Sequence, residues 1–376
     1  MHGPPARAAI DGTAAGVHGA GLTSTATPAS DMRAILPHIA QILAAGLGGL
    51  AFHWLGVPAA WLSGSAVAAA LWGLTGWGVT LPRPLADAAM LISGAAMGAA
   101  VTPAALAAMG RYPESLVLLV IGVLAISSAS ALGLVRLSGW RMADAVLAST
   151  PGALSTVLAV AADRKADVAS IAIVQNFRLF VLIALLPSVV VLTGGGGNTG
   201  ALIGEGMPVE SPGGMAFTLL GGLALGLALK RIGLAAPILL GATLVSTVSH
   251  ATETVTGVIP PVIATGGLVL IGLFIAERFR NMERSTLRRA LAAAVGSFAI
   301  GMSVAALFAA LAAWVAGVSF ANSLVAFAPG GLEAMTVLAL VLGLDPLYVG
   351  IHHLVRFLGI GLVLPVAVAL LQRDKP

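Results

Sequence analysis

Long apolar segments separated by short polar stretches run along almost the whole chain. Most of them approach the roughly 20 residues that an α-helix needs to cross a bilayer, and none shows the alternation of a barrel strand. The pattern predicts an all-α polytopic membrane protein. The segments lie at 37–55, 57–76, 85–101, 114–135, 143–162 and 168–193, and then at 213–229, 234–250, 260–276, 290–314, 318–342 and 346–371.

The second half of the chain repeats the first at a nearly constant spacing. When Pro151 is placed on Pro329, residues 151–187 show 9 identities in 37 ungapped positions, and Arg178 falls on Arg356. Internal repetition of this kind indicates duplicated structural units. The sequence therefore predicts a flexible leader at 1–33, a first membrane repeat at 34–193, a Gly-rich linker at 194–212 and a second membrane repeat at 213–372.

One segment in each repeat contains a helix-breaking tract. The tract at 149–152 reads Ser-Thr-Pro-Gly, and the tract at 328–331 reads Ala-Pro-Gly-Gly. Proline removes a backbone donor and glycine favours unusual dihedral angles, so we predict that each segment is re-entrant or broken. Irregular backbone persists at membrane depth only where it is buried in protein or lines a cavity. The half-helix after each break would aim free N–H groups and a positive dipole end at that cavity.

Composition supports the membrane assignment, and charge predicts the topology. The chain is 58% hydrophobic and 9% charged, against about 25% charged residues in soluble domains. Lys and Arg prefer cytoplasmic loops. With re-entrant fifth and eleventh segments, 16 loop Lys and Arg residues lie inside and only Arg111 lies outside. Twelve full crossings would divide the same charges between both sides. We therefore predict two inverted repeats of about five transmembrane helices plus one re-entrant or broken helix each, with both termini cytoplasmic.

Known catalytic, metal-binding and nucleic-acid motifs are not visible in the sequence. The chain has no cysteine, which excludes disulfides and thiolate metal sites. It contains no P-loop, zinc motif or nucleophile elbow. The basic stretch Arg278–Arg289 is interpreted as a topology determinant that contacts anionic lipids. We therefore expect no enzyme activity, no catalytic residue, no cofactor, no metal and no nucleic-acid partner.

Two arginines lie deep inside apolar segments. Each follows by 11 residues an aspartate that we expect to cap its helix, which places it about 16 Å along that helix, near the bilayer midplane. A charge there costs roughly 3 kcal/mol or more. Gln175 and His353 precede Arg178 and Arg356 by three residues and share a helix face with them. Two interpretations stay open: the arginines line an anion site, or they fasten the broken helices by bonding free carbonyls.

Arginine is well shaped for bidentate contact with a carboxylate or phosphate. Glu333 follows the second break, where the first repeat has Ser155. It is a candidate for coupling to a proton, or for binding a cation such as sodium, although an acid in the first turn is also stabilised by the helix dipole. The expected substrate-binding set comprises Arg178, Arg356, Gln175, His353, Pro151, Gly152, Pro329, Gly330 and Gly331.

The same tracts carry a family resemblance. Residues 149–155 (STPGALS), 174–179 (VQNFRL) and 327–335 (FAPGGLEAM) resemble the AbrB-duplication family of bacterial integral membrane proteins over about 35–371. The first repeat departs from the pattern, since Ala153 replaces the second glycine and Ser155-Thr156 stands where Ser-Glu is common. The resemblance implies a duplicated multi-pass protein of the bacterial inner (plasma) membrane. Members are often labelled ammonia monooxygenase or regulators of gene expression, and the soluble transcription factor that shares the name has a different fold.

We expect a secondary transporter of a small anionic metabolite that works by alternating access. The expected partners are the small anionic molecule, the lipid bilayer and a coupling ion, either a proton or sodium; the sequence is also compatible with a homo-oligomer. One alternative is a membrane regulator that affects gene expression indirectly and binds a ligand without transporting it. The other is a membrane enzyme of the monooxygenase type, for which the sequence shows no metal-ligand cluster.

Overall fold

The structure, a computed structural model, describes residues 28–100, 112–152, 157–158, 160–161, 166–195, 206–234, 236–280 and 284–373. The chain divides into a unit of residues 1–36 and a unit of residues 37–376. Most of the predicted leader, most of the Gly-rich linker, Arg111, Ala153 and Ser155-Thr156 lie outside the described residues.

Helices make up nearly all of the described chain, apart from loops and an isolated bridge between Val209 and Val258. Among the described residues, five helical stretches are long and apolar enough to cross a membrane, at Ile35–Trp54, Tyr112–Ser138, Val168–Leu192, Pro212–Arg231 and Ser285–Ala316. The predicted all-α polytopic membrane fold is therefore confirmed. The elements are α1 (Pro28–Trp54), α2 (Ala60–Leu74), α3 (Arg83–Ala99), α5 (Tyr112–Ser138), α6 (Met142–Ser149) and α8 (Val168–Leu192), then α9 (Pro212–Arg231), α10 (Pro237–Ala251), α11 (Pro261–Ala276), η2 (Glu277–Phe279), α12 (Arg284–Ala316), α13 (Phe320–Phe327), α14 (Leu332–Val341) and α15 (Pro346–Arg373).

Helix starts recur at the spacing seen in the sequence. The starts of α6 and α13, and those of α8 and α15, lie 178 residues apart, and those of α2 and α10 lie 177 apart. A left-handed alanine, Ala59 or Ala236, precedes α2 and α10 at the same spacing. Asp167 and Asp345 accept backbone N–H bonds at the starts of α8 and α15, as expected of caps. These matches support two repeats; their inversion across a membrane stays a prediction.

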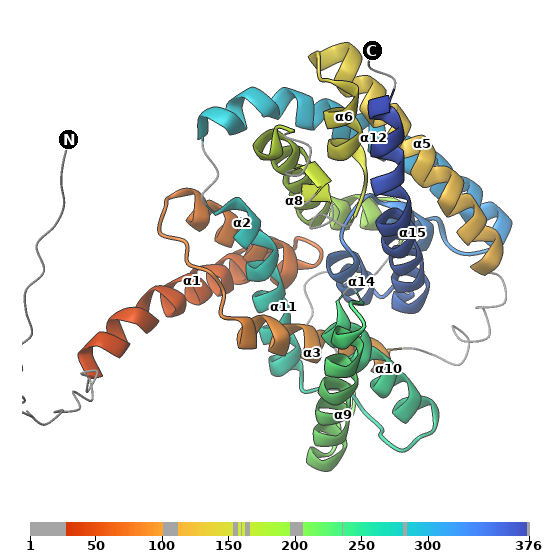
Figure 1. Ribbon diagram of the computed structural model, residues 1–376. Coiled ribbons are helices and arrows are strands. Elements are labelled where there is room, and N and C mark those ends of the chain that lie inside the picture. The colour runs from red at the N-terminus through yellow and green to blue at the C-terminus, as the bar shows by residue number, and fades with distance from the viewer. Residues whose placement is uncertain are drawn as a thin grey trace, which may run out of the picture. The chain divides into compact units, whose positions relative to one another are not determined.

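Helices from the two halves of the chain are interleaved in two bundles within residues 37–376 (Figure 1). In the first, called the scaffold bundle (α2, α3, α9, α10 and α11), α2 packs on α11 and α3 on α10. In the second, the broken-helix bundle (α5, α6, α8 and α12 to α15), α12 packs on α5 and α8, while α13 and α14 pack on α15. Contacts of α2 with α8 and of α3 with α14 join the bundles.

Small residues let the scaffold helices approach closely. A Cβ atom added to Gly222 would lie 2.7 Å from the Cα atom of Ala242, and one added to Gly241 would lie 2.7 Å from the Cα atom of Gly226. Glycine is therefore required where α9 meets α10, as in other closely packed membrane helices. In the broken-helix bundle, the large side chains of Phe327 and Tyr348 are fully buried.

Candidate functional site

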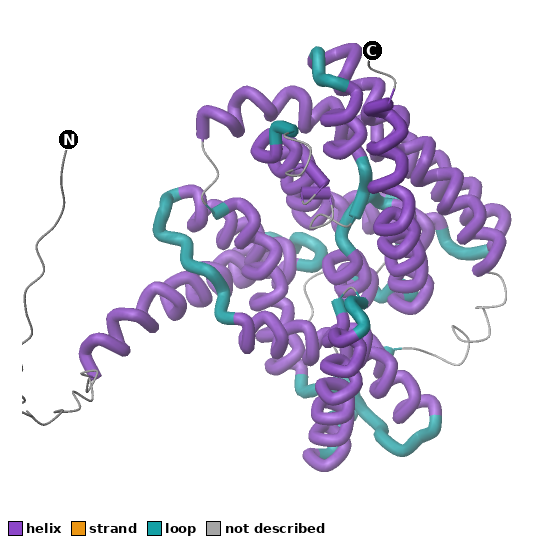
Figure 2. Tube along the Cα trace, viewed as in Figure 1, coloured by secondary structure: helices purple, strands orange, loops and turns teal. Residues whose placement is uncertain are grey.

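Both predicted helix breaks lie inside the broken-helix bundle, where Figure 2 draws them as loops. Helix α6 ends at Ser149, Thr150 is extended, and Gly152 adopts a left-handed conformation with φ of 82°. Helix α13 ends at Phe327, and α14 begins at Leu332 after an extended Ala328 and Gly331. The prediction of broken segments is thus confirmed. Whether these segments re-enter a membrane from one side stays a prediction.

The first break is fastened by α8. Arg178 donates from Nη1 to the carbonyl of Ser149 at 3.2 Å and from Nη2 to that of Thr150 at 3.2 Å. Nη2 also donates to Oε1 of Gln175 at 2.8 Å. The amide nitrogen of Gln175 donates in turn to the carbonyls of Leu147 and Thr150. Together these two side chains satisfy carbonyls that the end of α6 leaves without helical partners.

The second break is fastened by α15 in the same manner. Arg356 donates to the carbonyl of Ala328 at 2.7 Å and to that of Gly330. Its Nη2 atom lies 2.6 Å from Nδ1 of His353, whose Nε2 atom lies 3.0 Å from the carbonyl of Val325. A guanidinium has only donors, so Nδ1 accepts and Nε2 carries the proton. His353 is therefore neutral here. It contacts the arginine and a carbonyl of the preceding half-helix, as Gln175 does beside the first break.

Most of the N–H groups of both arginines are used to fasten the helix breaks. Fastening is one of the two interpretations that the sequence left open. Each guanidinium donates three of the hydrogen bonds described above, out of five N–H groups. The Nε atoms of Arg178 and Arg356 are buried and have no hydrogen-bond partner among the described residues. Both arginine side chains are buried, so their positive charges lie inside the broken-helix bundle.

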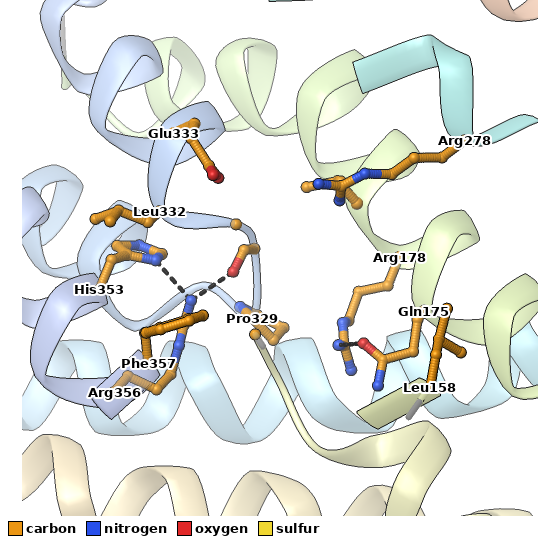
Figure 3. A pocket seen from close by; sticks show the side chains of 14 residues that line it. Leu158, Gln175, Arg178, Arg278, Pro329, Leu332, Glu333, His353, Arg356 and Phe357 are labelled. Carbon is orange, nitrogen blue, oxygen red and sulfur yellow. Dashed lines mark hydrogen bonds between the residues drawn. The ribbon is translucent and has the colours of Figure 1, made fainter. Parts of the chain in front are cut away.

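A cavity of about 360 Å³ opens between the two breaks. Arg178 and Arg356 lie on opposite sides of Pro329 in it (Figure 3). All of the predicted substrate-binding residues line it except Pro151, which is buried and is not among the described lining residues. The lining consists of Gly152, Leu158, Gln175, Arg178, Leu179, Arg278, Pro329, Gly330, Gly331, Leu332, Glu333, His353, Arg356 and Phe357.

The N-terminus of α14 also faces this cavity. Gly331, Leu332 and Glu333 line it, and no side chain caps the helix. The first bond of the helix runs from the amide of Met335 to the carbonyl of Gly331, so the three preceding amides have no helical acceptor. Free N–H groups and the positive end of the helix dipole together favour an anion.

Arg278 is a lining residue that the sequence analysis assigned to a different role. It lies on η2, the turn between α11 and α12, and was interpreted as a topology determinant. Asn176 of α8 donates to the backbone carbonyl of Arg278 at 3.3 Å, which holds this turn beside the arginine of the first repeat. Figure 3 shows Arg278 and Glu333 facing one another at one end of the cavity. Burial lowers the pKa of Arg278, while the charges of Glu333 and Glu277 raise it.

Glu333 takes part in two cavities. Besides the central one, it lines a cavity of about 220 Å³ with Asp87 of α3 and Lys230 at the end of α9. The carboxylate thus lies between the broken-helix bundle and the scaffold bundle.

Comparison with known families gives one match. A family model described as "Transition state regulatory protein AbrB" matches residues 61–372. This range includes both breaks and every residue that lines the central cavity. No curated protein matches the chain.

Proposed function

We propose that this chain, which belongs to the AbrB family, is a secondary transporter that moves a small anionic metabolite across the bacterial inner membrane by alternating access. The observation that carries the proposal is the central cavity, where the two helix breaks, three arginines and the free N-terminus of α14 meet. Arg178 and Arg356 hold the breaks and supply positive charge, and the amides of α14 supply donors.

The contents of the cavity favour an anion over a neutral or cationic substrate. Its described lining carries three guanidinium groups and one carboxylate, Glu333, and His353 is neutral in the observed hydrogen-bond arrangement. The excess positive charge is therefore two. A volume of about 360 Å³ falls within the roughly 300–1,000 Å³ of small-molecule sites, so a small organic acid or a phosphate fits.

The arrangement of helices supports transport. Transporters with internal repeats hold their substrate at broken helices near the bilayer midplane, and one bundle rocks against the other around that site. Here each bundle contains helices of both repeats, and the cavity is lined by the broken-helix bundle and by Arg278, which follows α11 of the scaffold bundle. Movement between the bundles would change access to the cavity.

The proposal is tested first by ligand binding and then by flux. Purified full-length protein is screened by thermal shift against organic acids, phosphates, and neutral and cationic compounds of similar size. We expect stabilisation by one class of anion alone. That anion should then enter proteoliposomes at a saturable rate, and an Arg231→Gln variant, which loses an exposed charge at the end of α9, should behave as wild type. Stabilisation by cations only, or none, would contradict the proposal.

A second candidate is a membrane regulator that senses the same anion and affects gene expression indirectly. The description of the family as regulatory favours it. It predicts stabilisation by an anion with no flux into proteoliposomes. Measurable flux of the stabilising anion would therefore decide for the transporter.

A further inference from the structure

The three arginines of the central cavity differ in how many of their donors are already used. Arg178 and Arg356 each donate three hydrogen bonds to their own broken-helix region, and only their buried Nε atoms stay without a partner among the described residues. Neither can present a planar pair of N–H groups to a ligand without releasing one of these partners. Bidentate recognition of a carboxylate or phosphate requires such a pair.

The guanidinium of Arg278 has such a pair available. Within the described part of the chain, none of the hydrogen bonds or ion pairs involves its side chain; only its backbone carbonyl accepts a bond, from Asn176. Its nearest acidic neighbour in the cavity, Glu333, faces it without forming an ion pair (Figure 3). A partly buried arginine whose guanidinium N–H groups are not used in other hydrogen bonds is the residue best suited to bind an oxyanion.

The position of Arg278 adds a second argument. It is carried by η2, which packs on α2 and α11 of the scaffold bundle, whereas the other charged lining residues belong to α8, α14 and α15 of the broken-helix bundle. An anion held by Arg278 on one side and by the N-terminus of α14 on the other would join the two bundles. Its binding would thus favour one arrangement of the bundles over another.

We infer that Arg278 is the residue that binds the substrate's oxyanion, and that the substrate is a small dianion. The charge of the ligand follows from the excess of two positive charges in the lining. This inference rests on the proposed function, because it names a binding residue and a substrate class for the same cavity. The oxyanion belongs either to a dicarboxylate or to a phosphate.

The test measures dissociation constants by calorimetry on the full-length protein in detergent at pH 7.5. The probes are succinate, inorganic phosphate and acetate, so that dicarboxylate, phosphate and monoanion are distinguished. Wild type should bind succinate or phosphate. It should bind acetate at least tenfold more weakly than the tighter of these two. Arg278→Gln should weaken the tighter dianion by about 10–100-fold, as expected for lost bonds to a charged group. Arg278→Lys should also weaken binding of this dianion, because the planar pair of N–H groups is lost even though the charge remains.

Two further variants separate binding from folding. Arg280→Gln removes a charge two residues along the same loop, where Arg280 lines a different cavity with Gln41 and Gly78; its affinity should stay within twofold of wild type. Glu333→Gln removes the carboxylate that opposes the anion, and it should bind the dianion more tightly. A misfolded variant could not show this gain.

The outcomes distinguish the inference from the function on which it rests. If wild type binds a dianion and both Arg278 variants bind it equally well, Arg278 does not bind the oxyanion, although the transporter proposal stands. Equal affinity for acetate would overturn the dianion class alone. If wild type binds none of the probes and no anion of the thermal-shift screen, both the inference and the proposed function fail.

Discussion

Arg178 and Arg356 show why a charged side chain can be retained deep in an apolar segment. Each guanidinium bonds two backbone carbonyls beside a helix break, and each break would otherwise leave those carbonyls unsatisfied in a medium without water. The roughly 3 kcal/mol cost of placing an arginine there is offset by hydrogen bonds to a charged donor, each worth about 1.5–3 kcal/mol. The same side chains bring positive charge to the cavity.

Arg178→Lys and Arg356→Lys should each lower the melting temperature of the ligand-free protein, because an ammonium cannot span the carbonyls that the fork bonds. Loss of one or two bonds to a charged donor corresponds to about 3 kcal/mol of unfolding free energy. Each variant should also be stabilised less by the substrate anion, because the breaks that border the cavity are no longer held in place. Arg231→Lys, an exchange at an exposed position, is the control. Unchanged melting with lost ligand stabilisation would show that the arginines bind substrate without fastening the breaks.

His353→Gln should leave both stability and transport close to wild type. Gln175 already bonds Arg178 and a carbonyl of the preceding half-helix in the first repeat, and His353 makes the corresponding two contacts in the second. His353→Leu should lower the melting temperature, because it leaves a buried carbonyl and an Arg356 donor unpaired. If His353→Gln abolished accumulation of substrate while the protein stayed folded, the histidine would be a proton carrier.

At the scale of the element, the two breaks use their glycines in different ways. Gly152 has a φ of 82°, while Gly331, which follows the corresponding Gly330, is extended with a φ of −86°. A Cβ added to Gly331 would meet ordinary contacts, the nearest being Oε2 of Glu333 at 3.5 Å. The first repeat has alanine at the position that matches Gly331.

Gly152→Ala should therefore be costly and Gly331→Ala nearly neutral. A left-handed alanine costs about 1–2 kcal/mol relative to its preferred conformation, and the contact that its Cβ would make, 3.7 Å from Nε of Arg356, is unstrained. Gly331→Ala should change stability by no more than about 0.5 kcal/mol. The measurement is the melting temperature of both variants in one detergent, and equal losses would show that the break is not held by the conformation of Gly152.

The first turn of α14 is the place where coupling can be tested. Glu333 lies there between two cavities, so a proton could reach it from the side of Asp87 while substrate occupies the other. Glu333→Gln keeps the shape of the side chain and removes its titration. In proteoliposomes this variant should still exchange substrate across the membrane but should fail to concentrate it along an imposed pH gradient. Accumulation at the wild-type rate would exclude Glu333 as the proton carrier and leave a sodium ion as the next candidate.

At the scale of the whole molecule, the orientation of the repeats can be tested at matching residues. Thr75 and Thr252 follow α2 and α10, lie 177 residues apart and are both exposed. The chain has no cysteine, so Thr75→Cys and Thr252→Cys each introduce a single reactive site. Inverted repeats predict that a membrane-impermeant thiol reagent labels Thr252→Cys from outside and Thr75→Cys only from the cytoplasmic side. Labelling of both from the same side would favour twelve full crossings.

The sequence by itself determined the fold class and the two breaks. Apolar segments of membrane length leave few alternatives to helices, because the bilayer core offers no partner for backbone polar groups. Proline and glycine act on the backbone locally, so the interruptions at 150–152 and 328–331 could be placed without tertiary structure. The pairing of Gln175 with Arg178 on one helix face followed from helical spacing in the same way.

Only the tertiary structure decided what these residues touch. The sequence left open whether Arg178 fastens a helix or faces a ligand, because that depends on where the end of α6 lies, and long-range packing sets that position. The interleaving of helices from both halves of the chain in each bundle was likewise not encoded in any local pattern. Arg278 is the clearest case: a loop arginine carries no local signal of burial, and it lines the cavity because η2 lies beside α8, where Asn176 bonds its backbone.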